Sequence, residues 1–323
     1  MKDPTSIFVT KPYLPPLEEL QEGLNNIWES KNVANQGKYH QEFEQELSKH
    51  LGVPHVSLFT NCTIALIVAI RALELQGNII TSPFSFPATL HSLTWNNINP
   101  LFVDIDKNTL NIDVNLIEKS INDKTTAILA VHAFGNPCQV NEIENLAEKY
   151  NLKVIYDGAA SLGSKFNDKS VLSFGDISVV SFHATKILNT FEGGAIISKS
   201  ATIKNKVECI RNFGLAPNDE LMPIGINGKM SEFNSLLGLI QIKHFKQILE
   251  MRVKIAQLYN EKLKFSPNIE IPNMLFSKNY NFTYYPILFK DNSTRDYVYN
   301  EMHKKGIFVR KYYYPLFDNI VDL

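Results

Sequence analysis

The sequence predicts an α/β fold: a mostly parallel sheet flanked by helices, followed by a smaller C-terminal α+β domain. Between Val56 and Ser198, short β-branched or apolar runs alternate with helical patterns. In one of these patterns, Ile143, Ala147 and Tyr150 recur at helical spacing. Repetition of strand, helix and strand is typical of a parallel sheet covered on both faces. The length of 323 residues fits roughly two domains of about 150 residues each.

Seven short runs have the composition of strands. In a parallel sheet, ligands bind at the carboxyl ends of the strands, so the residues that follow these runs are the first candidates for a site. The expected strands are Val56–Phe59, Ile79–Ser82, Leu101–Asp104, Ala127–His132, Val154–Asp157, Ile177–Phe182 and Ala195–Ser198.

Helical patterns flank this alternating region on both sides. Apolar residues at helical spacing over Leu17–Ile27 predict an N-terminal helix, and those over Ile248–Tyr259 predict a long helix. A second unit is expected to begin near Phe265. We therefore expect an N-terminal arm and large domain over residues 1–248 and a small domain over residues 249–323.

The composition excludes several classes of protein. With a net charge of −1, the chain lacks the excess of positive charge that is typical of nucleic-acid-binding proteins. The apolar run Ile64–Ile70 is too short to span a bilayer, and Met1–Pro4 carries no signal core, so a cytoplasmic protein is expected. The three cysteines, Cys62, Cys138 and Cys209, are widely separated and predict neither a disulfide framework nor a metal site.

Lys186 is the most informative residue. It lies between the expected strand Ile177–Phe182 and the glycines at 193 and 194, so its amine should stand at a strand end where a carbonyl can reach it. A Schiff-base lysine is displayed in this way. The alternative is a solvated surface lysine, which is the commoner fate of lysines in such connections.

Asp157 and Phe86 also follow expected strands. A carboxylate at the end of a buried strand needs a partner, and a protonated pyridine nitrogen is one candidate. The alternative for Asp157 is a helix cap. Phe86 is placed to stack on a flat aromatic ligand, although a core position is the alternative for a single phenylalanine.

The turn Thr60–Thr63 joins the first expected strand to a helical run, which places its amides and hydroxyls at a helix N-terminus. This geometry binds phosphate. Ser181, five residues before Lys186, offers another hydroxyl to the same anion. The alternatives are an ordinary helix cap and a strand-end serine.

Taken together and in order, these segments resemble the DegT/DnrJ/EryC1/StrS family of sugar aminotransferases, which are pyridoxal phosphate (PLP) enzymes of fold type I. The resemblance runs from about Ile7 to the C-terminus. Within the family, the amino-acid sequence around Lys186 and over Arg310–Leu316 most resembles the branch that acts on dTDP-4-keto-6-deoxyglucose. The segments are Thr60–Thr63, Pro83–Thr89, Val131–Cys138, Asp157–Ala160, Ser181–Gly194 and Gly225–Glu232.

The resemblance implies a role for each candidate. Lys186 would bind the cofactor covalently, Asp157 would contact its pyridine nitrogen, and Phe86 would stack on its ring. The phosphate would be held by Cys62, Thr63 and Ser181, and by Asn227 from the neighbouring subunit, which implies a homodimer with shared active sites. Without the family, Asn227 would be interpreted as a turn residue.

Two features depart from the family pattern. Position 160 carries Ala160, whereas relatives have Gln or His there to hydrogen-bond the ring hydroxyl of the cofactor. That contact is therefore expected to be missing or supplied from elsewhere. The chain ends at Leu323, soon after Tyr312–Pro315, so we expect either an abbreviated small domain or a truncated chain.

The resemblance implies an aminotransferase that moves nitrogen from glutamate to a keto nucleotide sugar, for deoxyaminosugar synthesis in O-antigen or a similar glycan. A family-related dehydratase is one alternative, but such enzymes replace the lysine at position 186. A catalytically weak PLP-binding protein with a regulatory role is another. A plain nucleotide-binding domain is disfavoured because no glycine-rich fingerprint follows the first strand.

Overall fold

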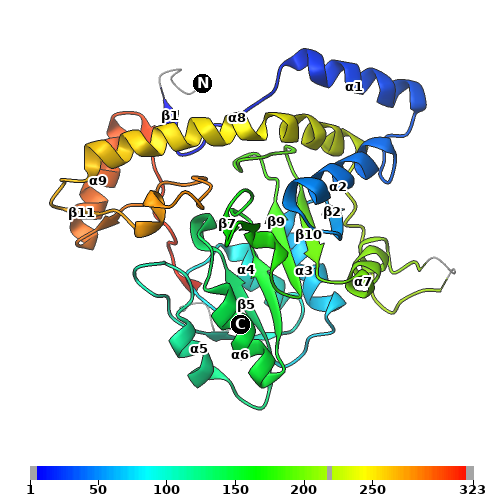
Figure 1. Ribbon diagram of the computed structural model, residues 1–323, viewed down its shortest axis with the longest axis horizontal. Helices are drawn as coiled ribbons and strands as arrows, with labels where there is room; N and C mark the ends of the chain where they lie inside the picture. The colour runs from blue at the N-terminus through cyan, green and yellow to red at the C-terminus, as the bar shows by residue number, and fades with distance from the viewer. Residues whose placement is uncertain (1–5, 217–219, 318–323) are drawn as a thin grey trace.

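The computed structural model describes residues 6–216 and 220–317; Met1–Pro4 and Leu323 lie outside them. A seven-stranded sheet with the order β2-β10-β9-β6-β5-β3-β4 occupies the centre (Figure 1). All seven expected strands are present, each within two residues of its expected bounds. They are β2 (Val56–Phe59), β3 (Asn78–Thr81), β4 (Asn99–Phe102), β5 (Thr125–Val131), β6 (Lys153–Asp157), β9 (Ile177–Ser181) and β10 (Gly194–Ser198).

The strand directions bring the candidate residues to one edge. Strand β10 is antiparallel to both of its neighbours, β2 and β9. The remaining neighbouring pairs are parallel. Every strand except β10 therefore points the same way, and the segments that follow β2, β6 and β9 meet at the carboxyl edge of the sheet.

Helices cover both faces of the sheet, and a separate buried apolar cluster fills the space on each side. The first cluster packs α2, α6 and α8 on one face, and the second packs α3, α4 and α7 on the other. The helices are α1 (Leu17–Ser30), α2 (Lys38–Leu51), α3 (Cys62–Ala72), α4 (Pro87–Thr94), α5 (Val114–Ser120), α6 (Val140–Tyr150), α7 (Ala201–Arg211), α8 (Glu232–Leu263) and α9 (Asn292–Lys304).

Helix α8 is one continuous helix of 32 residues. It crosses the upper part of the view in Figure 1, with α9 near one end and α1 near the other. The expected domain boundary after residue 248 falls inside this helix, so the division into domains stays a prediction.

The C-terminal unit contains α9 and short two-residue strands. One of these strands, β13, pairs in parallel with β1 from the N-terminus. The C-terminal unit and the N-terminal segment of the chain are therefore in contact. The short strands of this unit are β11 (Ile269–Glu270), β12 (Leu288–Phe289) and β13 (Ile307–Phe308). The other two-residue strands are β1 (Ile7–Phe8), β7 (Lys165–Phe166) and β8 (Lys169–Ser170). Over residues 6–216 and 220–317, we find no helix that combines the length and apolar character of a membrane span.

Candidate active site

The turn between β2 and α3 places backbone amides at the N-terminus of α3. The side chain of Asn61 caps α3 by accepting a hydrogen bond from the Ile64 amide at 2.9 Å. The amide of Cys62 then lies at the positive end of the helix, where an anion is favoured. Gly194 approaches this turn so closely that an added Cβ would lie 2.8 Å from the Cys62 nitrogen. Only a glycine fits at the start of β10, which pairs with Ser181 on β9.

Asp157 is a buried carboxylate for which the described part of the chain shows no ion pair. It ends β6, is 5% exposed, and accepts hydrogen bonds from the Thr89 hydroxyl at 2.7 Å and the Ala159 amide at 3.0 Å. Among the described residues, no lysine, arginine or histidine nitrogen lies within 4.0 Å of it. Since burial of an unpaired charge is costly, this carboxylate is suited to a cationic ligand, as a protonated pyridine nitrogen would be.

Lys186 stands in the connection from β9 to β10. Burial lowers the pKa of its amine, and the thiol of Cys62 and the carboxylate of Asp157 act in the opposite direction. Strands β6 and β9 are neighbours, with Asp157 paired to Val179, so the connection that carries Lys186 begins beside the end of β6. The Lys186 Nζ atom also lies 3.5 Å from the hydroxyl of Tyr284 and 5.6 Å from the centre of that ring. A lysine with a lowered pKa is well suited to attack a carbonyl.

The remaining candidates at this edge differ in exposure. Phe86 precedes α4 and its ring is 59% exposed, so the alternative of a core position is wrong. Ser181 is buried, and its hydroxyl accepts a hydrogen bond from the His183 amide at 3.3 Å. Thr63 is partly exposed in the first turn of α3. An open aromatic face, strand-end hydroxyls and free amides fit a flat phosphorylated cofactor.

Asn227 is exposed and lies on a segment attached to the turn between β2 and α3. The Thr60 amide donates to the Gly228 carbonyl at 2.8 Å, and the Gly228 amide donates to the Arg211 carbonyl at 2.9 Å. The backbone of this segment is therefore fixed between the turn after β2 and the end of α7. The side chain of Asn227 remains available to another molecule.

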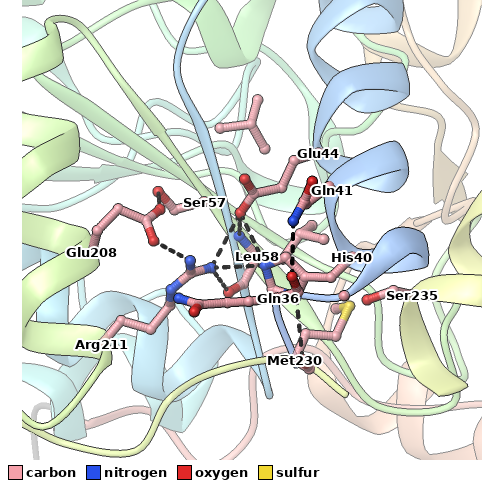
Figure 2. Close-up of polar contacts among 12 residues, drawn as sticks. Gln36, His40, Gln41, Glu44, Ser57, Leu58, Glu208, Arg211, Met230 and Ser235 are labelled. Carbon is pink, nitrogen blue, oxygen red and sulfur yellow. Dashed lines mark hydrogen bonds and ion pairs between the residues drawn. The ribbon is translucent and has the colours of Figure 1, made fainter. Parts of the chain in front are cut away.

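A buried charged cluster around Arg211 contacts this segment (Figure 2). Arg211 is 1% exposed and contacts Glu44, Glu208 and the Leu58 carbonyl. Although burial opposes ionisation of Glu44, the hydrogen bond from His40 and the charges of Arg211 and Lys204 lower its pKa to about 2.

The charged cluster also reaches the segment that carries Asn227. The Nδ1 atom of His40 lies 3.2 Å from the Met230 carbonyl. The cluster thus joins α2, β2 and α7 to residues 227–230.

The structure adds residues that the sequence patterns did not single out. Thr89 lies in the quoted segment Pro83–Thr89, but nothing in its spacing marks it as the partner of Asp157. Tyr284 contacts Lys186 from 98 positions further along the chain. No local pattern connects residues so far apart.

Comparisons with known proteins agree with this geometry. The model of the DegT/DnrJ/EryC1/StrS aminotransferase family matches residues 17–320. A dTDP-4-amino-4,6-dideoxy-D-glucose transaminase of Shigella dysenteriae is 47% identical over 312 residues, which cover 96% of this chain and 85% of that protein.

Two solved structures share the fold. The structure of DesI, determined in the presence of its TDP-sugar product, has a TM-score of 0.92 at 28% identity and covers 99% of this chain and 82% of that one. The Bacillus subtilis protein ntda, solved with bound cofactor PMP, has a TM-score of 0.86 at 25% identity, with 98% of this chain and 75% of that one covered.

Proposed function

This chain belongs to the DegT/DnrJ/EryC1/StrS aminotransferase family, and we propose that it transfers an amino group from glutamate to dTDP-4-keto-6-deoxy-D-glucose. Its class is that of a PLP-dependent sugar aminotransferase. The dTDP sugar is favoured by the 47% identity to the Shigella dysenteriae transaminase and by the TDP-sugar product of DesI.

The observation that carries the proposal is the neighbourhood of Lys186 and Asp157 at the carboxyl edge of the sheet. When bound, PLP supplies an aldehyde that links to amines and a ring that withdraws electrons. Asp157 holds positive charge on the ring nitrogen and so strengthens that withdrawal. Lys186 would hold the cofactor through its Nζ atom, and the same amine would take and return the proton at the reacting carbon of the substrate.

The environment of Lys186 suits this work. Because burial lowers the pKa of its amine, a larger fraction of the side chain is neutral, as a base requires. Cys62, Thr63 and Ser181 are proposed to hold the cofactor phosphate, and Phe86 is proposed to cover the ring. Each of these residues lies at the same edge of the sheet.

A homodimer is part of the proposal, with Asn227 reaching the phosphate of the partner subunit. Large apolar side chains are exposed on the chain beside this segment: Phe213 is 53%, Leu215 50% and Leu221 71% exposed. Exposed apolar surface of this kind marks interaction sites. A cytoplasmic location and use in O-antigen synthesis stay predictions.

An absorbance titration of the PLP-loaded protein tests the proposal. Glutamate should bleach the visible cofactor band, and addition of dTDP-4-keto-6-deoxy-D-glucose should restore it with formation of the amino sugar. If glutamate leaves the band unchanged, the transaminase proposal is wrong and a cofactor-binding role is favoured. A product whose mass shows loss of water, without gain of nitrogen, would favour the dehydratase alternative.

A further inference from the structure

Tyr284 is the one side chain of the C-terminal unit whose contact with Lys186 the described residues record. Its hydroxyl lies 3.5 Å from the Lys186 Nζ atom, although the two residues are 98 positions apart. Neither strand-end loop supplies this group. Its ring packs against that of Tyr312 at a centroid distance of 5.5 Å, and Tyr312, Arg310 and Thr185 each act to lower the pKa of its hydroxyl.

The segment that carries Tyr284 is fixed to the loop after Asp157. The amide nitrogen of the Asn281 side chain donates to the carbonyls of Ala160 at 2.6 Å and Leu162 at 2.9 Å. The Tyr280 hydroxyl reaches the carbonyls of Phe134 at 2.9 Å and Tyr284 at 2.8 Å. These contacts hold the backbone that carries Tyr284 in place before any ligand binds, and a fixed backbone favours a preorganised polar contact in a site.

The protonation of Tyr284 suits a donor. Burial raises the pKa of its phenol, and the hydrogen bond with Tyr312 and the charge of Arg310 oppose this only in part. The hydroxyl therefore keeps its proton at neutral pH. By contrast, the methyl group of Ala160 on the neighbouring loop cannot hydrogen-bond at all.

We propose that Tyr284 donates a hydrogen bond to the ring hydroxyl oxygen of the bound cofactor and so tunes the nitrogen that links the cofactor to Lys186. This inference rests on the proposed function. In PLP the ring hydroxyl is adjacent to the aldehyde that joins the lysine, so a donor beside the Lys186 Nζ atom is placed to serve that oxygen. A side chain from the C-terminal unit thus supplies what Ala160 cannot.

A donor to the ionised ring oxygen withdraws charge from it and weakens its hold on the proton of the linking nitrogen. Replacement Tyr284→Phe keeps the ring, whose neighbours are Phe134 and Tyr312, and removes only the hydroxyl. The pH at which the visible cofactor band changes should rise by roughly one unit. Tyr285→Phe is the matched control, because the Tyr285 hydroxyl donates instead to Asn260 at 2.6 Å.

The pH titration of the band is run on the PLP-loaded parent protein and both variants. A rise in Tyr284→Phe alone supports the proposal, and equal midpoints in all three proteins overturn it. If Tyr284→Phe does not fold, Tyr312→Phe takes its place, since it removes a hydrogen-bond partner of Tyr284. A smaller rise then supports the proposal, and an unchanged midpoint overturns it. Bleaching of the band by glutamate in the parent protein shows separately whether the proposed function holds.

Discussion

Two groups of buried charges in this protein differ in whether they form ion pairs within the described part of the chain. Around Arg211, the guanidinium meets the carboxylates of Glu44 and Glu208, so each charge is neutralised inside the protein (Figure 2). At the carboxyl edge of the sheet, Asp157 is equally secluded, yet within the described residues it has hydrogen-bond donors and no ion pair. The first arrangement is complete without a ligand, whereas the second is suited to receive one.

The difference separates a structural role from a catalytic one. Arg211 closes a cluster that fixes α2, β2 and the segment before Met230, so its loss should lower stability. Lys186 has the 3.5 Å contact with Tyr284 and a pKa that burial lowers, so its loss should remove activity and leave the fold intact.

Lys186→Ala should have the largest effect on function. Since acid–base catalysis by a positioned group is worth about 10² to 10⁴ in rate, glutamate-dependent turnover should fall by at least that factor. The free energy of unfolding should not fall, because a buried amine is removed. Steady-state amination and denaturant unfolding measure the two quantities, with Lys199→Ala, an exposed lysine after β10, as the control. Undiminished turnover in Lys186→Ala would show that Lys186 has no catalytic role, and the contrast with the structural role of Arg211 would be wrong.

Arg211→Met should mainly lower the free energy of unfolding. It removes the buried cation that Glu44 and Glu208 share and leaves them the more exposed Lys204. Breaking a buried ion pair costs about 3–5 kcal/mol. Urea unfolding of the variant and the parent protein measures this loss. Lys49→Met is the matched control, because the exposed pair of Lys49 with Glu46 should contribute about 1 kcal/mol or less. Equal losses in the two variants would show that burial does not determine how much the Arg211 cluster contributes to the free energy of unfolding.

Acid should weaken the cluster in a defined range of pH. The pKa of Glu44 is lowered from 4.5 to about 2 in the folded protein. The unfolded chain therefore binds a proton at Glu44 first, so its stabilising contribution is complete above about pH 4.5 and is lost as the pH falls toward 2. Unfolding curves between pH 6 and pH 3, in steps of about one unit, should show a smaller pH dependence for Glu44→Gln than for the parent protein. Identical pH profiles would contradict the ion pairing of Glu44.

The sequence was sufficient for the sheet because its signals are local. Runs such as Val154–Asp157 and Ile177–Phe182 are β-branched or apolar, bounded by turn residues, and each became a strand of the central sheet. The strand ends then placed Asp157 and Lys186 at one edge, which the topology confirmed. The cofactor roles of Cys62, Thr63, Phe86, Ser181 and Asn227 stay predictions.

Contacts between distant segments were beyond the sequence. Arg211 and Glu44 are 167 positions apart, and an isolated arginine on a helical pattern looks like any surface charge. Tyr284 was missed for the same reason, since only the folded chain brings it to Lys186. The long helix α8 likewise ran through the expected boundary at residue 248, because its helical pattern continues without a break.

The central claim is that Lys186 binds PLP covalently beside the carboxylate of Asp157. Borohydride reduction of the reconstituted protein, followed by tryptic digestion and mass spectrometry, tests it most directly. We predict that the cofactor is fixed on the peptide that contains Lys186 and on no other lysine peptide. Recovery of that peptide without the cofactor, while the protein still binds PLP, would contradict the claim.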